Sequence, residues 1–258
     1  MAPSYHLVYF DIRGRAEPIR ILFALAGASY TEERVNPSEW PALKTSGRCP
    51  FGQVPVLELG DGKSLCQSAV ILKYVANELG FSPSDSYAKA QAEMFVDSIK
   101  DFQNELQRLA REKAADPKDE KKSSLYDAEI AKTLEIIDNL LQQKNGGKSY
   151  LLPVLELGDG KSLCQSSVIL RYVANELGFT PSDSYGKARA EVFVDALKDL
   201  ENQFGRFIWE KDADRKAKMK SSLYDEEIPK NLEFIDKLFQ QNNGGKGYLV
   251  GDKIVNCC

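Results

Sequence analysis

The residues best placed to do chemistry in this chain lie in a stretch that occurs twice. PVLELGDGKSLCQS begins at Pro55 and begins again, unchanged, at Pro153. Its last two residues, Gln67 and Ser68, open a predicted helix, because serine is a favoured residue at a helix start. Two polar residues in this position are candidates for binding a ligand. A plain helix cap is the alternative for Ser68.

The histidine and cysteine content limits the other chemistries. His6 is the only histidine and alternates with Leu7 in a strand pattern, which excludes Ser-His catalysis and argues against most zinc sites and any metal centre. The five cysteines are odd in number and form no C-x-x-C pair, so we expect free thiols in a cytoplasmic protein. They are Cys49, Cys66, Cys164, Cys257 and Cys258.

Length and charge describe an ordinary globular chain. Its 258 residues are 43% hydrophobic and 28% charged, enough for a sizeable core. The net charge of -4 gives no basic field for a phosphate backbone, so we expect no nucleic-acid partner. No apolar run reaches the roughly 18 residues of a membrane span, and no signal peptide is evident, so we expect no membrane partner.

A long internal repeat dominates the organisation. A shift of 98 residues aligns 55–151 with 153–249 without a gap, and 68 of the 97 pairs are identical. In the first 26 pairs the only differences are Ala69/Ser167 and Lys73/Arg171. Two long copies after a segment that occurs once indicate a duplication and not a solenoid.

The predicted helices and strands must position Gln67 and Ser68 and the residues of the site that face them. Residues 5–10 and 29–35 read as strands around a helix at 17–28. Residues 54–67 read as a hairpin before a helix that Ser68 starts and Gly80 ends. Two long helices follow between 84 and 141. In the second copy we expect the same hairpin and helices at about 165–177, 183–211 and 221–241.

This order resembles that of the glutathione transferases, and most closely the sigma class with its prostaglandin D synthases and lens crystallins. The resemblance covers 1–151. It implies an α/β plus all-α protein, with a thioredoxin-like N-terminal domain and an irregular, incomplete helical region. The motifs that carry it are YHLVYFDIRGRAEPIR, SEWPALK, CPFGQVPVLE and LCQSAVILKYVANELG.

The resemblance implies that Tyr9 and Arg15 are catalytic. Tyr9 matches the tyrosine whose hydroxyl donates a hydrogen bond to the glutathione sulfur, and Arg15 matches an arginine that favours the thiolate. The alternatives are a core aromatic at a strand end and a surface charge at a helix start.

The same resemblance assigns the glutathione-binding residues. Trp40 and Lys44 match residues at the glycine end of glutathione. Val54 precedes a proline that the family holds in the cis form, so that the Val54 backbone can pair with the cysteinyl unit. With Gln53 and Pro55, these residues form one side of the expected site.

The γ-glutamyl end is assigned to the helix start. There the backbone N–H groups and the helix dipole at Gln67 and Ser68 suit a carboxylate. Asp101 matches acidic residues that can reach the γ-glutamyl amine of a partner subunit. Lys100 stands where the prostaglandin synthases have another acid, which argues against their metal-stimulated behaviour.

The second copy repeats only half of this site. Gln165 and Ser166 return, but nothing upstream repeats Tyr9, Arg15, Trp40 or Lys44. The resemblance implies further helices after 247–253, which we expect to be missing here, and we expect the second copy's helices to pack on those of the first in their place. We expect the first copy, and not the second, to complete the β-α-β unit.

The sequence therefore predicts three domains, 1–80, 81–151 and 152–258, in a cytoplasmic homodimer. The predicted function is conjugation of glutathione, as co-substrate, to a small hydrophobic electrophile. The alternatives are a crystallin-like structural or glutathione-binding protein and a glutathione-dependent prostaglandin isomerase.

Overall fold

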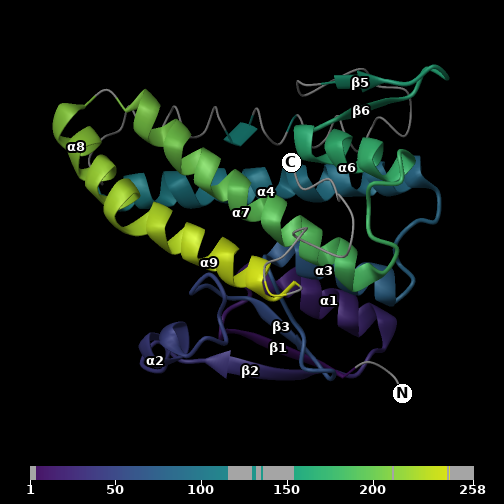
Figure 1. The fold of residues 1–258 in the computed structure, drawn as a ribbon, viewed down its shortest axis with the longest axis horizontal. Coiled ribbons are helices and arrows are strands. Elements are labelled where there is room, and N and C mark those ends of the chain that lie inside the picture. The colour runs from purple at the N-terminus through teal and green to yellow at the C-terminus, as the bar shows by residue number, and fades with distance from the viewer. Residues whose placement is uncertain are drawn as a thin grey trace. The chain divides into compact units, whose positions relative to one another are not determined.

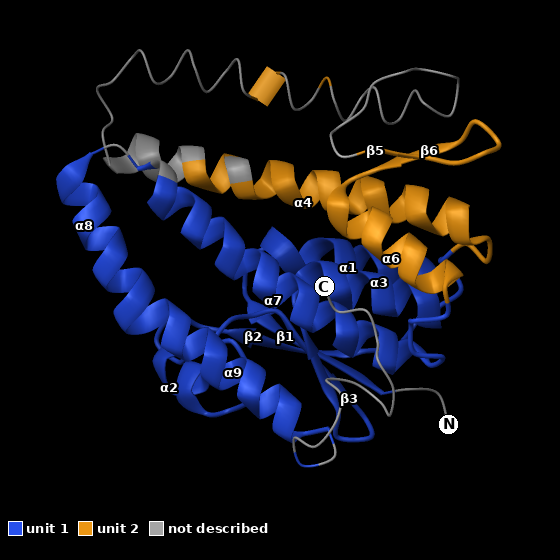
Figure 2. Cartoon of the chain, turned by 45° about the horizontal axis from the view of Figure 1, so that its top comes forward, with its two compact units in different colours: residues 1–82, 178–258 blue, residues 83–177 orange. Residues whose placement is uncertain are grey.

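A computed structural model describes residues 4–115, 130–131, 135, 154–210, 212–242 and 244. The chain forms two compact units (Figure 2). Unit 1 combines residues 1–82 with 178–258, and unit 2 comprises residues 83–177. The first boundary lies close to the one expected after residue 80, whereas residues of the second copy are divided between the units. The three-domain division remains a prediction.

Unit 1 is built on a four-stranded sheet with the order β2-β1-β3-β4. Its strands are β1 (Tyr5–Phe10), β2 (Thr31–Val35), β3 (Val56–Leu59) and β4 (Ser64–Cys66). β1 pairs with β2 in parallel and with β3 antiparallel, as expected for a thioredoxin-like domain. Since the partner of β1 is β3, the expectation that the first copy completes this sheet is confirmed.

The helices of unit 1 come from both ends of the chain. Residues 1–82 supply three of them, and the second copy supplies the other three. A π-helical turn, Ser222–Glu227, lies between the last two helices. They are α1 (Glu17–Ala26), α2 (Trp40–Thr45), α3 (Ser68–Glu78), α7 (Ser184–Trp209), α8 (Ala213–Ser221) and α9 (Ile228–Gln240).

One apolar core joins α1, α3, α7 and α9 to the sheet. α7 packs on α3, and α7 and α9 run side by side (Figure 1). Leu57 and Val70 of the first copy are buried in the same cluster as Phe193 of α7 and Phe234 of α9. The second copy therefore supplies part of the core on which the N-terminal sheet depends.

Unit 2 pairs the long helix of the first copy with the hairpin of the second. It contains α4 (Ser86–Ala115), β5 (Val154–Glu156), β6 (Ser162–Cys164) and α6 (Ser166–Glu176). Two strands alone are marginal in water, but here Leu163 and Cys164 are buried against α4. α6 also packs on α4, as expected for helices of the second copy on those of the first. The predicted helix up to residue 141 lies mostly outside the described residues.

The two units thus contain reciprocal junctions between the copies. α3 of the first copy meets α7 of the second in unit 1, and α6 of the second copy meets α4 of the first in unit 2. In unit 2, Asp97 accepts hydrogen bonds from Ser167 at 3.0 Å and from Arg171 at 2.8 Å. In unit 1, Lys73 lies 3.7 Å from Glu191.

The cysteines follow the prediction where they are described. Cys49, Cys66 and Cys164 are buried free thiols, and Cys257 and Cys258 lie outside the described residues. Burial raises the pKa of Cys66 to about 12, so this thiol stays neutral near pH 7. Across the described residues, no helix is long and apolar enough to cross a membrane, and no cluster of His, Cys, Asp and Glu side chains is suited to a metal ion.

Candidate functional site

Tyr9 lies near the end of β1, with only 5% of its surface exposed. Its hydroxyl oxygen accepts a hydrogen bond of 3.0 Å from the backbone N–H of Arg15. A phenolic hydroxyl accepts through its lone pairs and donates through its proton. The O–H proton therefore remains to be donated, and the incoming bond polarises the hydroxyl toward donation.

Gly14 permits this contact. It lies in the short turn Gly14–Ala16 with a φ of 44°, a conformation that side chains disfavour. A Cβ atom on Gly14 would lie 2.7 Å from the Tyr9 hydroxyl oxygen. The sequence reading overlooked Gly14, although its position between two arginines in FDIRGR was visible.

We predict that Gly14→Ala lowers turnover roughly 10- to 100-fold, because the new methyl group displaces the Tyr9 hydroxyl from its working position. Gly27→Ala is the matched control. Gly27 also has a positive φ, 61°, but a Cβ atom there meets nothing within 4 Å. Both variants carry a similar backbone penalty of about 1 kcal/mol. Steady-state kinetics on the two proteins that gave equal losses of turnover would contradict this role for Gly14.

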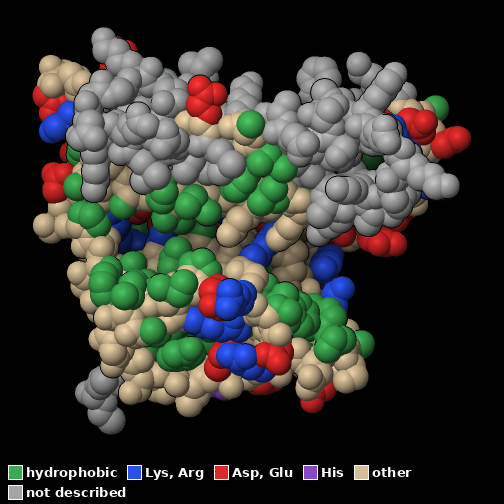
Figure 3. All heavy atoms as spheres, turned by 180° about the vertical axis from the view of Figure 1, so that it is seen from behind, with side chains coloured by type: hydrophobic (Ala, Val, Ile, Leu, Met, Phe, Trp, Pro, Cys, Tyr) green, Lys and Arg blue, Asp and Glu red, His purple; other side chains and the backbone are tan. Residues whose placement is uncertain are grey.

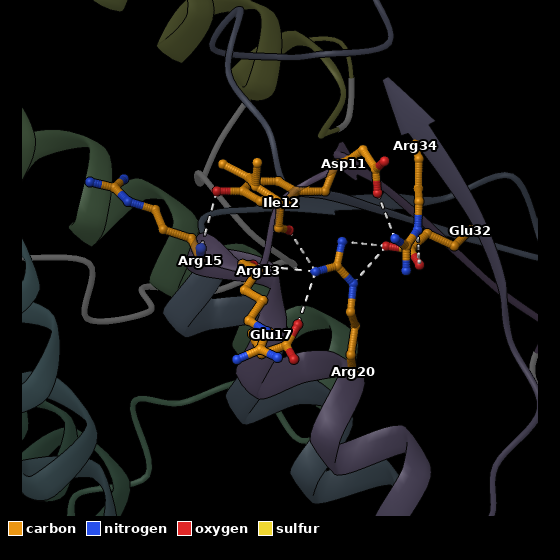
Figure 4. A network of polar contacts seen from close by, with 9 residues as sticks. Asp11, Ile12, Arg13, Arg15, Glu17, Arg20, Glu32 and Arg34 are labelled. Atoms are coloured by element: carbon orange, nitrogen blue, oxygen red, sulfur yellow. Dashed lines mark hydrogen bonds and ion pairs between the residues drawn. The ribbon is translucent and has the colours of Figure 1, made fainter. Parts of the chain in front are cut away.

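A polar network fixes the loop that carries Gly14 and Arg15 (Figure 4). From α1, Arg20 donates to the carbonyl oxygen of Ile12 at 2.8 Å and pairs with Glu32 of β2 at 2.6 Å. It also pairs with Glu17 at 3.1 Å. Arg20 is the second residue that the sequence reading missed. Its i, i+3 spacing from Glu17 was the available signal.

The residues predicted for the glycine end lie around α2. The Trp40 ring packs edge-on against Phe10, with ring centroids 5.2 Å apart, and is half-buried. Lys44 is exposed in the last turn of this helix, and its side chain reaches Gly52. The structure therefore brings Trp40 and Lys44 onto one short helix, which the sequence reading did not predict.

The Val54-Pro55 peptide bond is cis, as the resemblance implied. Pro55 is buried, Val54 is half-buried, and Gln53 is exposed just before β3. These three residues form the link between the α2 region and the hairpin.

Gln67 and Ser68 open α3 in an unusual backbone conformation. Gln67 has a φ of 69°, which is uncommon for a residue with a side chain and can mark a functional site. Its side-chain amide donates a hydrogen bond of 3.1 Å to a carboxylate oxygen of Asp199 in α7. Ser68 is half-buried at the helix start.

The repeat changes which aspartate faces Gln67. Asp101 is exposed on α4 and accepts from Gln165 at 3.2 Å within unit 2, and Gln165 has the same backbone conformation as Gln67, with a φ of 71°. Asp199 is the counterpart of Asp101, 98 residues later. The sequence reading missed Asp199, although the repeat register gave its position.

Two models of known protein families match the chain. The model of the glutathione S-transferase N-terminal domain matches residues 5–77, and that of the glutathione S-transferase C-terminal domain matches residues 198–255. Both matched ranges belong to unit 1. The second copy therefore carries a stretch similar to the family's C-terminal domain.

Individual relatives agree with the family models. Glutathione S-transferase 1 of Ascaris suum is 30% identical over 204 residues, which cover 78% of this chain and 93% of that protein. Hematopoietic prostaglandin D synthase of Gallus gallus is 44% identical over 100 residues, 39% of this chain and 49% of the relative. A solved glutathione S-transferase of Caenorhabditis elegans has 28% identity and a TM-score of 0.50, covering 91% of this chain and 98% of its own.

The match to the Ascaris protein extends over most of both chains, and the matched N-terminal domain contains the thioredoxin-like sheet with Tyr9 on its first strand. The chain belongs to the glutathione S-transferase family, a family of transferases that use glutathione as co-substrate.

Proposed function

We propose that this chain conjugates the glutathione thiolate to small hydrophobic electrophiles, with Tyr9 as the donor to the sulfur. The observation that carries the proposal is the Tyr9 hydroxyl, which accepts from the Arg15 N–H and keeps its proton to donate. Arg15 adds positive charge on the same loop. Both favour the anion over the neutral thiol, and we assign most of the pKa shift to Tyr9, the direct donor to the sulfur.

The size of the effect can be bounded. A thiol with a pKa of about 8.5 is only about 3% ionised at pH 7, and lowering the pKa by about two units raises the thiolate fraction roughly 25-fold. Because nucleophilicity falls with the pKa, the net gain in the rate of attack is only about threefold. The remaining acceleration must come from holding the electrophile beside the sulfur.

We propose further that glutathione lies across unit 1, with its glycine end near Trp40 and Lys44 and its cysteinyl unit along Gln53, Val54 and Pro55. The γ-glutamyl carboxylate is assigned to the start of α3 at Gln67 and Ser68. A helix start supplies N–H donors and the positive end of the dipole.

For the γ-glutamyl amine we propose Asp199. The resemblance assigned this amine to a carboxylate of a partner subunit and, by position, to Asp101. Asp199 lies within hydrogen-bonding distance of Gln67 in the same chain, which supports it over Asp101 as the acceptor. The second copy would then supply in one chain what a partner subunit supplies elsewhere.

The repeat provides matched controls for this assignment. We predict that Ser68→Ala weakens glutathione binding roughly 10- to 100-fold, because a carboxylate loses one charge-assisted hydrogen bond. Asp199→Asn should weaken it about fivefold, as expected for a partly exposed ion pair. Ser166→Ala and Asp101→Asn, the same changes in the other copy, should have little effect in titration calorimetry. A larger effect of Asp101→Asn than of Asp199→Asn would reverse the assignment of the amine.

The avian prostaglandin D synthase relative favours a glutathione-dependent prostaglandin isomerase as a second candidate, and with it the sigma class. Turnover of a prostaglandin endoperoxide compared with that of a chlorinated aromatic electrophile distinguishes isomerase from conjugating enzyme. Glutathione binding without turnover of either substrate would indicate the crystallin-like alternative. The homodimer and the cytoplasmic location remain predictions.

A further inference from the structure

An open cleft of about 690 Å³ lies within unit 1. Its apolar lining includes Leu65, Phe234 and Leu238. Five cationic side chains line it against a single carboxylate, although the chain as a whole carries a net charge of -4. The cations are Lys44, Lys63, Arg189, Lys230 and Lys237, and the carboxylate is that of Glu233.

Most of the cations have partners in the protein. Lys63 pairs with Asp61 at 2.6 Å, and Lys237 pairs with Glu233 at 2.6 Å. On the face drawn in Figure 3, basic and acidic side chains likewise lie beside one another. Lys44 and Lys230 differ, because neither has a hydrogen-bond or ion-pair partner among the residues that the structure describes.

These two lysines converge on Gly52. A Cβ atom on Gly52 would lie 3.3 Å from Cε of Lys44 and 3.6 Å from Nζ of Lys230. Two ammonium groups held near one point repel each other, and an anion bound between them offsets that repulsion with two attractions. The absence of a side chain on Gly52 allows both lysine side chains to lie this close to it.

The backbone on both sides of this point is anchored by an aromatic contact. The rings of Phe51 and Phe234 have centroids 3.5 Å apart, and both residues are buried. Phe51 precedes Gly52, and Phe234 follows Lys230 by one helical turn on the same face of α9. The contact therefore fixes the position of Lys230 relative to Gly52.

We infer that Lys230 is a second binding residue for the free C-terminal carboxylate of glutathione, acting together with Lys44. This inference rests on the proposed function and deepens it. The site is specific for a thiol peptide that ends in a free carboxylate. Lys230 belongs to the second copy, so the repeat contributes at both ends of the bound tripeptide: Asp199 at the amine and Lys230 at the glycine carboxylate.

The test compares glutathione with its glycine monoethyl ester, which keeps every group except the C-terminal charge. Lys230→Gln should weaken binding of glutathione about three- to tenfold, the range for a charged hydrogen bond at an exposed site, and leave binding of the ester unchanged. Lys237→Gln is the matched control, because it removes the same charge from the same helix and cleft but from a lysine that already has a partner.

The outcomes of calorimetric titration separate the two proposals. If the unsubstituted protein binds neither glutathione nor its ester, the proposed function fails and this inference fails with it. If both bind but Lys230→Gln changes neither affinity, or changes both equally, the inference alone is overturned. Equal losses in Lys230→Gln and Lys237→Gln would also overturn it, since a general field of the cleft would then be the cause.

Discussion

Tyr9→Phe is expected to reduce the thiolate fraction of bound glutathione roughly 25-fold at pH 7. The substitution keeps the ring and removes only the hydroxyl. A donor to the sulfur stabilises the anion and lowers the thiol pKa, so its loss raises that pKa by about two units, back to about 8.5. The ultraviolet absorbance of the thiolate, recorded against pH with saturating glutathione, measures this directly.

The loss of turnover at pH 7 should be smaller than the loss of thiolate. A thiolate of higher pKa is the better nucleophile, and this offsets most of the lower population. We therefore expect a decrease of at least threefold at pH 7, and a pH–rate profile displaced upward by about two units. The displacement distinguishes a donor to the sulfur from a ring that merely packs, because lost packing would not move the profile.

Tyr5→Phe is the control for this experiment. Tyr5 lies on the same strand and is as deeply buried as Tyr9, but its hydroxyl is not assigned to glutathione. If Tyr5→Phe displaced the profile as far as Tyr9→Phe did, or if Tyr9→Phe left the thiolate titration unchanged, Tyr9 would not be the donor.

Local patterns in the sequence were sufficient to predict much of unit 1. The strands at 5–10 and 31–35 and the helices at 17–26 and 68–78 follow from alternation, helical periodicity and the glycines that end them. α2 was not predicted, because six residues with a proline in the first turn are too few to show a helical periodicity of apolar residues. α8 was not predicted, because it has no buried residue and hence no apolar stripe along one face.

The pairing of the two copies could not be read from local patterns. α3 and α6 are nearly identical in sequence, as are the start of α4 and that of α7, so each helix carries the same apolar stripe for either partner. Hydrophobic periodicity therefore allows pairing within a copy as well as between copies. The exchange observed here, α3 with α7 and α6 with α4, depends on long-range packing.

The two early differences between the copies lie at these junctions. Ser167 and Arg171 both donate to the buried Asp97 in unit 2. Their counterparts in unit 1 are Ala69 and Lys73, which cannot make the same pair of bonds. A buried carboxylate is costly without such donors, so Ser167 and Arg171 stabilise the junction of α6 with α4.

The lack of long-range information in local patterns also explains which residues of the candidate site could be predicted from the sequence. Tyr9, Lys44 and Ser68 lie within continuous motifs of the first 80 residues, where the resemblance is strong. Asp199 and Lys230 come from the second copy, more than 100 residues away, and reach the candidate site only through the packing of α7 and α9. Residues that depend on tertiary packing carry no signal of their own in one sequence.

Phe193→Ala is expected to destabilise unit 1 by about 3–5 kcal/mol, the usual cost of removing a fully buried phenylalanine from a core. Phe193 is 1% exposed and lies in the cluster that joins α7 to α3 and the sheet. Phe95→Ala is the matched control, because Phe95 is the equivalent residue of the first copy but is only half-buried on α4. Removal of the Phe95 side chain should lower the free energy of unfolding by about 1–2 kcal/mol, and this loss should affect unit 2.

Fluorescence during thermal unfolding separates the two effects, because both tryptophans, Trp40 and Trp209, belong to unit 1. At about 2–4 °C per kcal/mol for a chain of this size, Phe193→Ala should lower the fluorescence midpoint by roughly 6–20 °C. Phe95→Ala should leave it nearly unchanged. If the second copy were an appendage to a self-sufficient N-terminal domain, Phe193→Ala would leave the Trp40 signal intact. Equal shifts of the fluorescence midpoint in Phe193→Ala and Phe95→Ala would instead mean that the pairing of α3 with α7 is not preferred over the pairing of α3 with α4.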